Sequence, residues 1–235
     1  MNLISNLFRS SLGRKFVMAV TGLALFGFVI GHLLGNLQVF LGPDTLNAYG
    51  ALLHSNVELL WGARIGLLVC IFLHICMAIS LSAENRAARP VRYAVDDPPE
   101  ASLSSKTMLI SGLIVLTFIV YHLLHFTAQY EWVNGTGKNF QELVDDQGRH
   151  DVYSMVIVGF RNPLVSFFYL IGVGLLCLHL SHGVSAMFQS LGLKTKEWEP
   201  FITKASDVIA VLLLLGYASI PLAVLFGAIG KEVAK

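Results

Sequence analysis

The sequence predicts an all-α protein, an integral membrane bundle of five transmembrane helices that forms a single domain over residues 1–235. The first observation behind this prediction is the composition. Of the residues, 55% are hydrophobic and only 13% are charged, whereas a typical soluble domain is about 25% charged. The second observation is that five apolar segments reach the roughly 20 residues that a helix needs to cross about 30 Å of hydrocarbon. We therefore expect a lipid bilayer around most of the chain.

The expected spans are residues 16–40, 58–82, 107–130, 163–189 and 205–229. The first apolar run is longer than the core of about 7 to 15 residues in a signal peptide, so we expect it to stay as a membrane helix. Residues 82–106 are charged and rich in proline, which is typical of a loop. The connection between the third and fourth spans is the longest, and a short surface helix is a candidate near Phe140 to Asp145.

The distribution of Lys and Arg predicts the orientation, because cytoplasmic loops carry an excess of these residues. Ten lie in the N-terminal segment and in the second and fourth connections, against five in the third connection and the C-terminal segment. This places the N-terminus in the cytoplasm, and with five spans the C-terminus lies on the outer, periplasmic side. The net charge of +1 gives no basic field that would favour nucleic acid, so no such partner is expected.

Histidines provide the functional signal. Six of the eight lie inside the first four spans, always in the C-terminal half of their own helix: His32, His74, His122, His125, His179 and His182. Because successive helices run antiparallel, the histidines of spans one and three share one depth near the outer face. Those of spans two and four share another depth near the cytoplasmic face.

Two imidazoles that face each other across a bundle provide the axial ligation of a b-type haem. Gly27, Gly31 and Gly35 recur beside His32 and would give a smooth face to a flat ring, although this spacing also serves helix packing. Zinc is disfavoured because the spans contain no H-E-x-x-H motif. A di-iron carboxylate centre is disfavoured because Glu58 is the only carboxylate near the interior of a span.

Spans three and four each contain one histidine more than a haem pair requires. His122 and His125, like His179 and His182, are separated by three residues and share roughly one helix face, so the residues alone do not choose between them. The spare histidine can bond a haem propionate, a quinone or a backbone carbonyl. His54 and His150 are expected in outer loops, where His54 could reach a substrate at the membrane surface. Cys70, Cys76 and Cys177 are interpreted as packing residues.

Four blocks of the chain resemble a known family. They are "TGLALFGFVIGHLLGNLQVF" in span one, "HICMAISLSAENRAARPVRY" leaving span two, "SGLIVLTFIVYHLLHF" in span three and "HLSHGVSAMFQSLG" in span four. In this order and at this spacing they are similar to the five-helix, di-haem cytochrome b membrane-anchor subunit (b558 type) of succinate:menaquinone oxidoreductases and fumarate reductases, the respiratory complex II family.

The resemblance implies four axial ligands of haem iron and two non-covalent haem b groups. The histidine of the G-H-L-L-x-N block, His32, and the one ten residues after the S-G glycine, His122, would hold the distal haem. His74, before N-x-x-A-R-P, and His179, which opens H-x-x-x-G, would hold the proximal haem. This pairing agrees with the two depths inferred from the spans.

The resemblance also implies the partners and the reaction. The partners would be a flavoprotein subunit and an iron-sulfur subunit on the cytoplasmic face of a bacterial cytoplasmic membrane. Succinate would be oxidised in the flavoprotein. Electrons would then pass through the iron-sulfur clusters and both haems to menaquinone, the substrate of this chain. The chain would therefore be the quinone-reactive subunit of succinate dehydrogenase and would do no succinate chemistry itself.

The quinone site is predicted with fewer residues. Glu58, at the outer start of span two, is the candidate proton acceptor for the quinone, although a carboxylate at a helix N-terminus is equally expected for its effect on the helix dipole. Arg64 is costly inside a span and is expected to pair with a haem propionate or with Glu58. His125 and His182 are candidates for further propionate or quinone contacts.

Two alternatives stay open. The first is another quinone-linked di-haem subunit, of a nitrate reductase or formate dehydrogenase, against which the lack of histidine in the fifth span argues. The second is a haem-free transporter whose histidines relay protons. It would require discontinuous helices and acidic residues at mid-membrane, and only Pro221 suggests a break, in span five.

Overall fold

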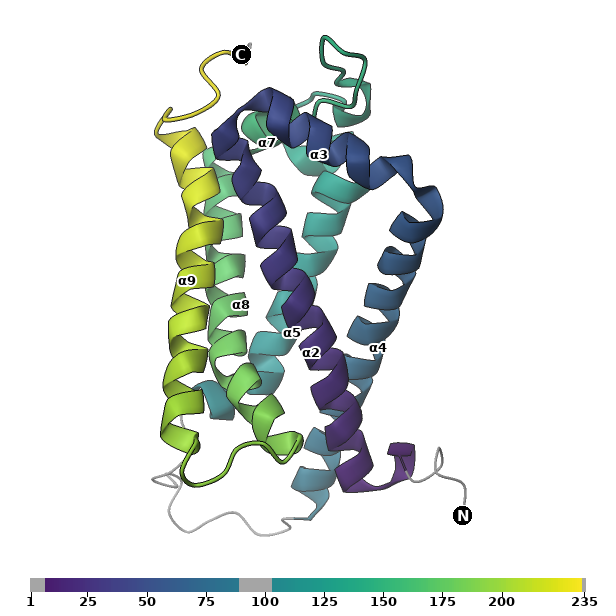
Figure 1. Cartoon of the computed structure of the whole chain (residues 1–235), viewed down its shortest axis with the longest axis vertical. Helices are drawn as coiled ribbons and strands as arrows, with labels where there is room; N and C mark the ends of the chain where they lie inside the picture. The colour runs from purple at the N-terminus through teal and green to yellow at the C-terminus, as the bar shows by residue number, and fades with distance from the viewer. Residues whose placement is uncertain (1–6, 89–102, 234–235) are drawn as a thin grey trace. The chain divides into compact units, whose positions relative to one another are not determined.

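The structure is a computed structural model that describes residues 7–88 and 103–233, with residues 103–107 described by their backbone alone. The described chain is helical throughout apart from turns and an isolated β-bridge between Val144 and His150. Figure 1 labels its long helices and the shorter helices that connect them.

Five of the described helices are long and apolar enough to cross a membrane, as predicted. They are α2 (Ser11–Asn36), continued by the 3-10 helix η1 (Leu37–Leu41); α4 (Val57–Ala87); α5 (Leu103–His122), continued by the π-helix η2 (Leu123–Thr127); α8 (Pro163–Ser190); and α9 (Glu199–Leu225). Several extend beyond the expected limits, because a helix continues into polar residues where the apolar pattern has already ended. The chain is thus built as a multi-pass membrane protein.

The connections contain more helix than the sequence suggested. They include α3 (Pro43–Ser55), α6 (Glu131–Asn134), the 3-10 turn η3 (Phe140–Glu142) and α7 (Val152–Arg161). The expected surface helix near Phe140 to Asp145 is only this single 3-10 turn. The expectation that His54 lies in a loop was wrong, because His54 is in the last turn of α3. Arg89 and Arg92, used to predict the orientation, lie outside the described residues.

The third long helix is interrupted and the fifth is not. After His122 the α-helical pattern of α5 changes to the π-helical pattern of η2, a change that occurs most often at functional sites. Gln129, two residues beyond η2, has a positive φ of 58°, which is uncommon for a residue other than glycine. Pro221, by contrast, lies within α9 without ending it.

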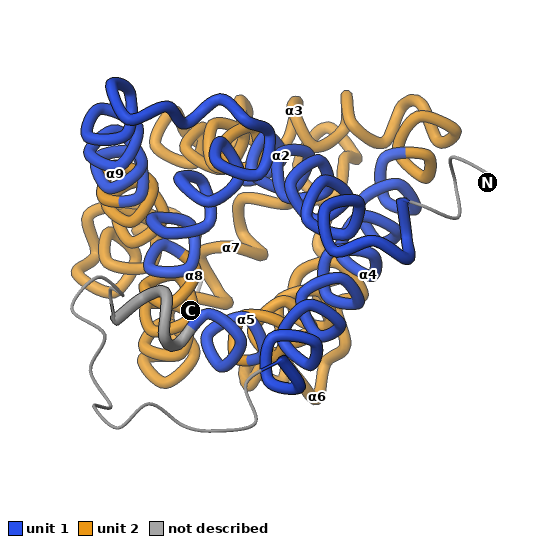
Figure 2. Tube along the Cα trace, turned by 90° about the horizontal axis from the view of Figure 1, so that it is seen from below, with its two compact units in different colours: residues 1–29, 63–113, 177–210 blue, residues 30–62, 114–176, 211–235 orange. Residues whose placement is uncertain are grey.

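The chain divides into two compact units, coloured blue and orange in Figure 2. Unit 1 comprises Met1–Val29, Ala63–Leu113 and Cys177–Ala210; unit 2 comprises Ile30–Gly62, Ile114–Leu176 and Val211–Lys235. Each long helix contributes to both units. The histidines divide accordingly: unit 1 contains His74, His179 and His182, and unit 2 contains the other five.

The core of unit 1 joins α2 to α8. Buried Ala19 packs with Val184 and Met187, and Arg14 ties α2 to α4 through an ion pair with Glu84 at 2.7 Å. These contacts fix the α2 surface that faces the histidines of this unit.

The core of unit 2 is formed around α7, seven of whose residues are buried. Asn47 of α3 donates hydrogen bonds to Asp145 and Asp151 and accepts one from the backbone N–H of Tyr153. Because an amide inside a protein core is costly without partners, these bonds make α3 a fixed part of the unit.

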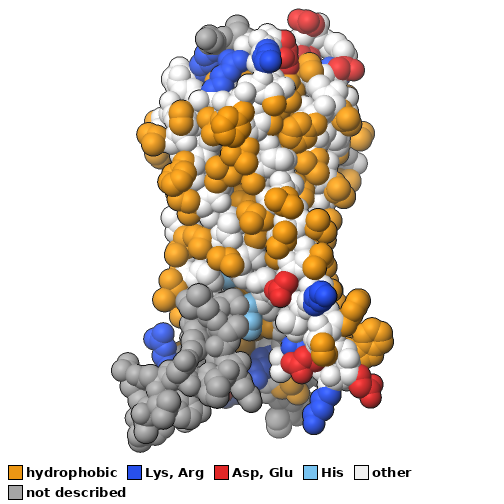
Figure 3. Space-filling view, turned by 90° about the vertical axis from the view of Figure 1, so that its left-hand side faces the viewer, with side chains coloured by type: hydrophobic (Ala, Val, Ile, Leu, Met, Phe, Trp, Pro, Cys, Tyr) orange, Lys and Arg blue, Asp and Glu red, His pale blue; other side chains and the backbone are white. Residues whose placement is uncertain are grey.

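The surface of the long helices is apolar. Phe72, Leu164 and Leu215 are among the large hydrophobic side chains that remain exposed, and in Figure 3 orange hydrophobic side chains cover much of the helical surface in view. Soluble proteins rarely expose continuous apolar surface of this extent, so lipid is the expected neighbour of these side chains.

Candidate functional site

In unit 1, His74 of α4 packs against α2 and is bonded through one ring nitrogen. Its Nδ1 lies 3.1 Å from the carbonyl oxygen of Met18 and 3.3 Å from Oγ1 of Thr21. A carbonyl only accepts, so Nδ1 must carry the ring proton and donate it. Nε2 of His74 therefore keeps its lone pair, which is the state in which a histidine binds a metal.

His179 of α8 is bonded in the same way. Its Nδ1 lies 3.3 Å from Oγ of Ser111, and that hydroxyl donates its own proton to the carbonyl of Met108 at 3.1 Å. Since the serine proton is already used, the serine oxygen accepts from Nδ1–H of His179. The lone pair of this imidazole is again left on Nε2.

A glycine follows each of these hydroxyl residues and receives the imidazole. A Cβ at Gly22 would lie 3.3 Å from Cε1 of His74, and a Cβ at Gly112 would lie 3.4 Å from Cε1 of His179. The tripeptides Thr21–Leu23 and Ser111–Leu113 thus form two copies of one hydroxyl–glycine cradle, on α2 and on α5. His74 and His179 are close enough for their charges to interact, so unit 1 contains two neighbouring imidazoles with matching tautomers.

In unit 2, His32 of α2 lies against His122 of α5. Their ring centroids are 5.7 Å apart, with the ring planes at 79°. The rings are therefore neighbours in an edge-to-face arrangement, and the structure brings together these two of the predicted histidines.

His125 packs on another ring, outside this pair. It is 0% exposed, stacks on Phe126 with centroids 3.9 Å apart, and its Nδ1 lies 3.0 Å from the hydroxyl of Tyr169. Its Nε2 lacks a hydrogen-bond partner among the described residues and lies 3.2 Å from the position that a Cβ of Gly159 would take. His122 and His125 thus differ in their closest ring neighbours, His32 for the first and Phe126 for the second, while both bond to Tyr169.

For the remaining predicted site residues the structure shows fewer contacts than for the paired histidines. His182 is half-buried and interacts electrostatically with Lys194. Arg64 is half-buried on α4. Glu58 lies exposed in the first turn of α4. Within the described part of the chain, its carboxylate has no hydrogen bond or ion pair. Its proposed contact with quinone stays a prediction.

Of the three glycines expected beside His32, only Gly35 is in close contact. A Cβ at Gly35 would lie 2.7 Å from Cε1 of Tyr49, whereas Gly27 and Gly31 have no described atom within 4 Å of that position. Gly35 therefore serves the packing of α2 on α3, which was the alternative reading of the spacing, and the other two leave open space.

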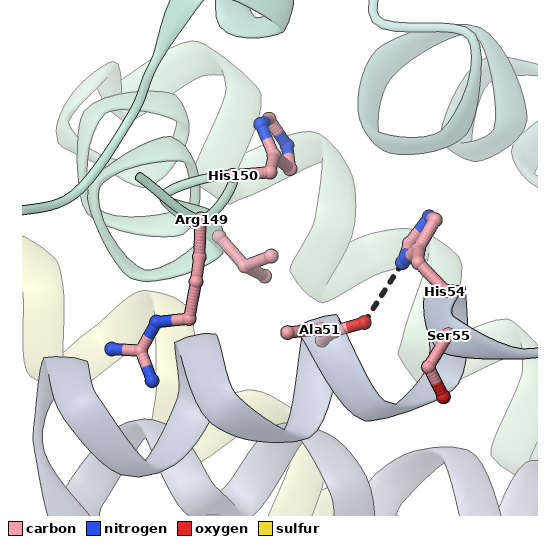
Figure 4. Close-up of a pocket in the computed structure, with 7 residues that line it drawn as sticks. Ala51, His54, Ser55, Arg149 and His150 are labelled. Atoms are coloured by element: carbon pink, nitrogen blue, oxygen red, sulfur yellow. Dashed lines mark hydrogen bonds between the residues drawn. The ribbon is translucent and has the colours of Figure 1, made fainter. Parts of the chain in front are cut away.

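A pocket of about 270 Å³ lies in unit 2, with a largely apolar lining to which two histidines and an arginine contribute. Figure 4 shows His150 and Arg149 on one wall and His54 with Ser55 on the other. His54 Nδ1 bonds to the carbonyl of Gly50 at 2.8 Å, the dashed line in the figure. Arg149 pairs with Asp44 at 2.7 Å, and this guanidinium holds the pKa of the Asp44 carboxyl below its usual range. The positive charge of the pocket is thus largely balanced.

Sequence reasoning missed the residues that hold the imidazoles: Thr21, Gly22, Ser111, Gly112 and Tyr169. A signal for the first four was present, because a hydroxyl residue followed by Gly-Leu occurs once in each of spans one and three. No comparable sequence pattern predicts the role of Tyr169, which lies on α8 and bonds to His122 and His125 from there.

Among the described residues there is no group of three or more His, Cys, Asp or Glu that could hold a bare metal ion. Haem is a different case, because its porphyrin supplies the in-plane ligands and the protein supplies the axial ones. Comparisons with family models, curated proteins and solved structures gave no match to this chain.

Proposed function

We propose that this chain is the di-haem cytochrome b subunit of a succinate:quinone oxidoreductase of the complex II family, and that it carries electrons between an iron-sulfur subunit and menaquinone. The observation that carries the proposal is the pairing of histidines within each unit. In unit 1 both imidazoles present an Nε2 lone pair, and in unit 2 the rings of His32 and His122 are neighbours with centroids 5.7 Å apart, which supports a shared ligand between them.

The residues fit haem by the chemistry of their donors. His74 and His179 would hold one haem and His32 and His122 the other. An acceptor oxygen on Nδ1 is the usual outer-shell partner of a metal-bound histidine, and Met18 and Ser111 supply such oxygens. When bound, each haem would supply an iron that alternates between the ferric and ferrous states.

The contribution of the protein is positioning and exclusion of water. The hydroxyl–glycine cradles fix the plane of each imidazole in unit 1, and the aromatic side chains around His122 exclude water in unit 2. In this proposal the N-terminus is cytoplasmic, the flavoprotein and iron-sulfur subunits dock on that face, and quinone reacts at the other end near the first turn of α4, with Glu58 as a candidate proton acceptor.

The proposal is tested by a reduced-minus-oxidised absorption spectrum of the purified complex, with haem counted per chain. We expect two b-type haems. His74→Ala and His179→Ala should each remove one haem, and His32→Ala and His122→Ala should each remove the other. The two losses should be distinguishable by midpoint potential.

His54→Ala and His150→Ala are matched controls, because they remove imidazoles outside the five predicted spans. Both variants should retain two haems. A complex that is complete and folded but contains no haem would refute the proposal and favour a proton-relay role for the histidines.

A further inference from the structure

The hydroxyl of Tyr169 lies between two imidazoles in unit 2. Oη of Tyr169, on α8, is 3.3 Å from Nδ1 of His122 and 3.0 Å from Nδ1 of His125. Tyr169 is 5% exposed and His125 is fully buried, so water does not readily replace these bonds. The three side chains form one short hydrogen-bonded chain.

A phenol has one proton, so Tyr169 can donate to only one of the two Nδ1 atoms, while its oxygen can accept from either ring. No other acceptor for the Tyr169 proton is found among the described residues, so two arrangements place this proton in a hydrogen bond. In the first arrangement His122 donates to Tyr169 and Tyr169 donates to His125. In the second, the direction is reversed along the whole chain.

Binding of a metal by His122 selects the first arrangement. With Nε2 of His122 holding a haem iron, the ring proton would be on Nδ1 and would be donated to Tyr169. Tyr169 then donates to Nδ1 of His125, and the proton of that ring moves to Nε2, the atom that lacks a partner beside Gly159. The state of His125 is thereby coupled to that of the ligand.

We infer that Tyr169 is a positioning residue that orients His122 and, with His125 behind it, sets the balance between ferric and ferrous iron in the haem of unit 2. The inference rests on the proposed function. An acceptor on Nδ1 makes the ligand more basic and favours ferric iron, and a hydroxyl that is itself donating is a stronger acceptor. In unit 1 the same position is served by Met18 and Ser111, each independent of the other.

The test is a spectroscopic redox titration of both haems in the Tyr169→Phe complex. Loss of the acceptor should raise the potential of the unit 2 haem, with an increase of about threefold to tenfold in the ferrous-to-ferric ratio at a fixed potential. The unit 1 haem should titrate as in the wild type.

Tyr121→Phe is the matched control. It removes the same hydroxyl from the same aromatic cluster, since Tyr121 and Tyr169 have centroids 5.8 Å apart. The hydroxyl of Tyr121, however, donates to the carbonyl of Val133 at 3.4 Å and to no imidazole. This variant should leave both potentials unchanged.

His125→Leu tests the last member of the chain. It should shift the unit 2 haem in the same direction as Tyr169→Phe but by less, because Tyr169 still accepts from His122. In the Tyr169→Phe background the same substitution should add no further shift, since effects within one hydrogen-bonded chain are not additive.

Equal shifts in Tyr169→Phe and Tyr121→Phe, or additive shifts in the double variant, would overturn the inference while leaving the proposed function intact. If Tyr169→Phe does not assemble, His125→Leu decides alone: no change at the unit 2 haem would overturn the inference. A wild-type complex without haem would instead refute the proposed function.

Discussion

The two units hold their histidines by different means. In unit 1, each imidazole is bonded by an oxygen of a facing helix and packs on the glycine that follows a hydroxyl residue, Thr21-Gly22 for His74 and Ser111-Gly112 for His179. In unit 2 the imidazoles lie among aromatic rings, and a single hydroxyl, that of Tyr169, bonds two of them.

The difference concerns how independently each ligand is oriented. Acceptors in unit 1 are fixed by the helix that carries them, because Thr21 and Ser111 also bond to carbonyls of their own helix. In unit 2 a change at one imidazole reaches the other through Tyr169. We therefore expect a single change in the hydrogen bonds of unit 1 to affect only the imidazole concerned, and unit 2 to respond as a group.

The largest effect is expected where packing around the unit 2 pair is overfilled. A Cβ at Gly172 would lie 2.6 Å from Cγ of Phe118, whose ring contacts His122 with centroids 6.2 Å apart. Gly172→Ala should lower the free energy of unfolding by about 1–3 kcal/mol, as overpacking does, and disturb the spectrum of the haem that we propose for unit 2. Thermal unfolding in detergent and absorption spectra measure both.

Gly174→Ala is the control for this prediction, since no described atom lies within 4 Å of its Cβ position on the same helix. It should be neutral in both measurements. A similar loss in Gly172→Ala and Gly174→Ala would show that α8 responds to any added methyl group and that the contact with Phe118 is unimportant.

An effect of up to the same size, confined to unit 1, is expected from the acceptors of this unit, and it differs between its two imidazoles. Ser111→Ala removes the side-chain oxygen that accepts from His179, and an unsatisfied buried donor costs about 1–3 kcal/mol. Thr21→Val should cost less, about 0.5–1.5 kcal/mol, because the Met18 carbonyl still accepts from His74. Loss of haem from unit 1 during thermal unfolding reports the difference.

Ser181→Ala serves as the control, because the hydroxyl of Ser181 bonds only to the carbonyl of Leu178 and faces outward. It should retain wild-type stability. Equal losses in Thr21→Val and Ser111→Ala would contradict the view that His74 has a second acceptor.

The smallest effect concerns the C-terminal segment of unit 2. Tyr153 donates to Glu232 at 2.5 Å. Burial and this bond raise the pKa of Tyr153 to about 12, and the hydroxyl lowers the pKa of Glu232. Because the pKa of Glu232 is lowered in the folded protein, this carboxyl stabilises the fold at pH above its ordinary pKa of 4.5. That stabilisation is lost as the pH falls through the pKa of the folded state. Because the pKa of Tyr153 is raised, the phenol stabilises the fold at pH below its ordinary pKa of 10, and this stabilisation is lost as the pH rises through about 12.

Tyr153→Phe and Glu232→Gln should therefore loosen the segment at neutral pH by at most about 1 kcal/mol, because the carboxylate is exposed. Faster tryptic cleavage after Lys231 measures the loosening. Tyr130→Phe, which removes an exposed phenol, should not change the cleavage rate, and neither haem potential should move. A shift in the midpoint potential of the unit 2 haem would show that the C-terminal segment is coupled to the hydrogen-bonded chain of His122, Tyr169 and His125.

Much of the membrane architecture could be predicted, because the length and apolarity of a span are local properties. All five expected spans are helices of suitable length and composition in the described chain. The helices α3 and α7 were missed, since both lie in segments too short to span a membrane and are stabilised by contacts with each other, such as those of Asn47.

The sequence by itself determined the helical class, the five spans and the separation of the histidines into two groups, because these depend on composition and on position along a helix. Only the tertiary structure decided which imidazole of each close pair faces a partner. His122 lies against His32, and His125 stacks on Phe126. His122 is the last residue of α5 and His125 lies in the π-helical η2. The rings that they contact, such as His32 and Phe140, come from other elements, and no local pattern encodes these neighbours.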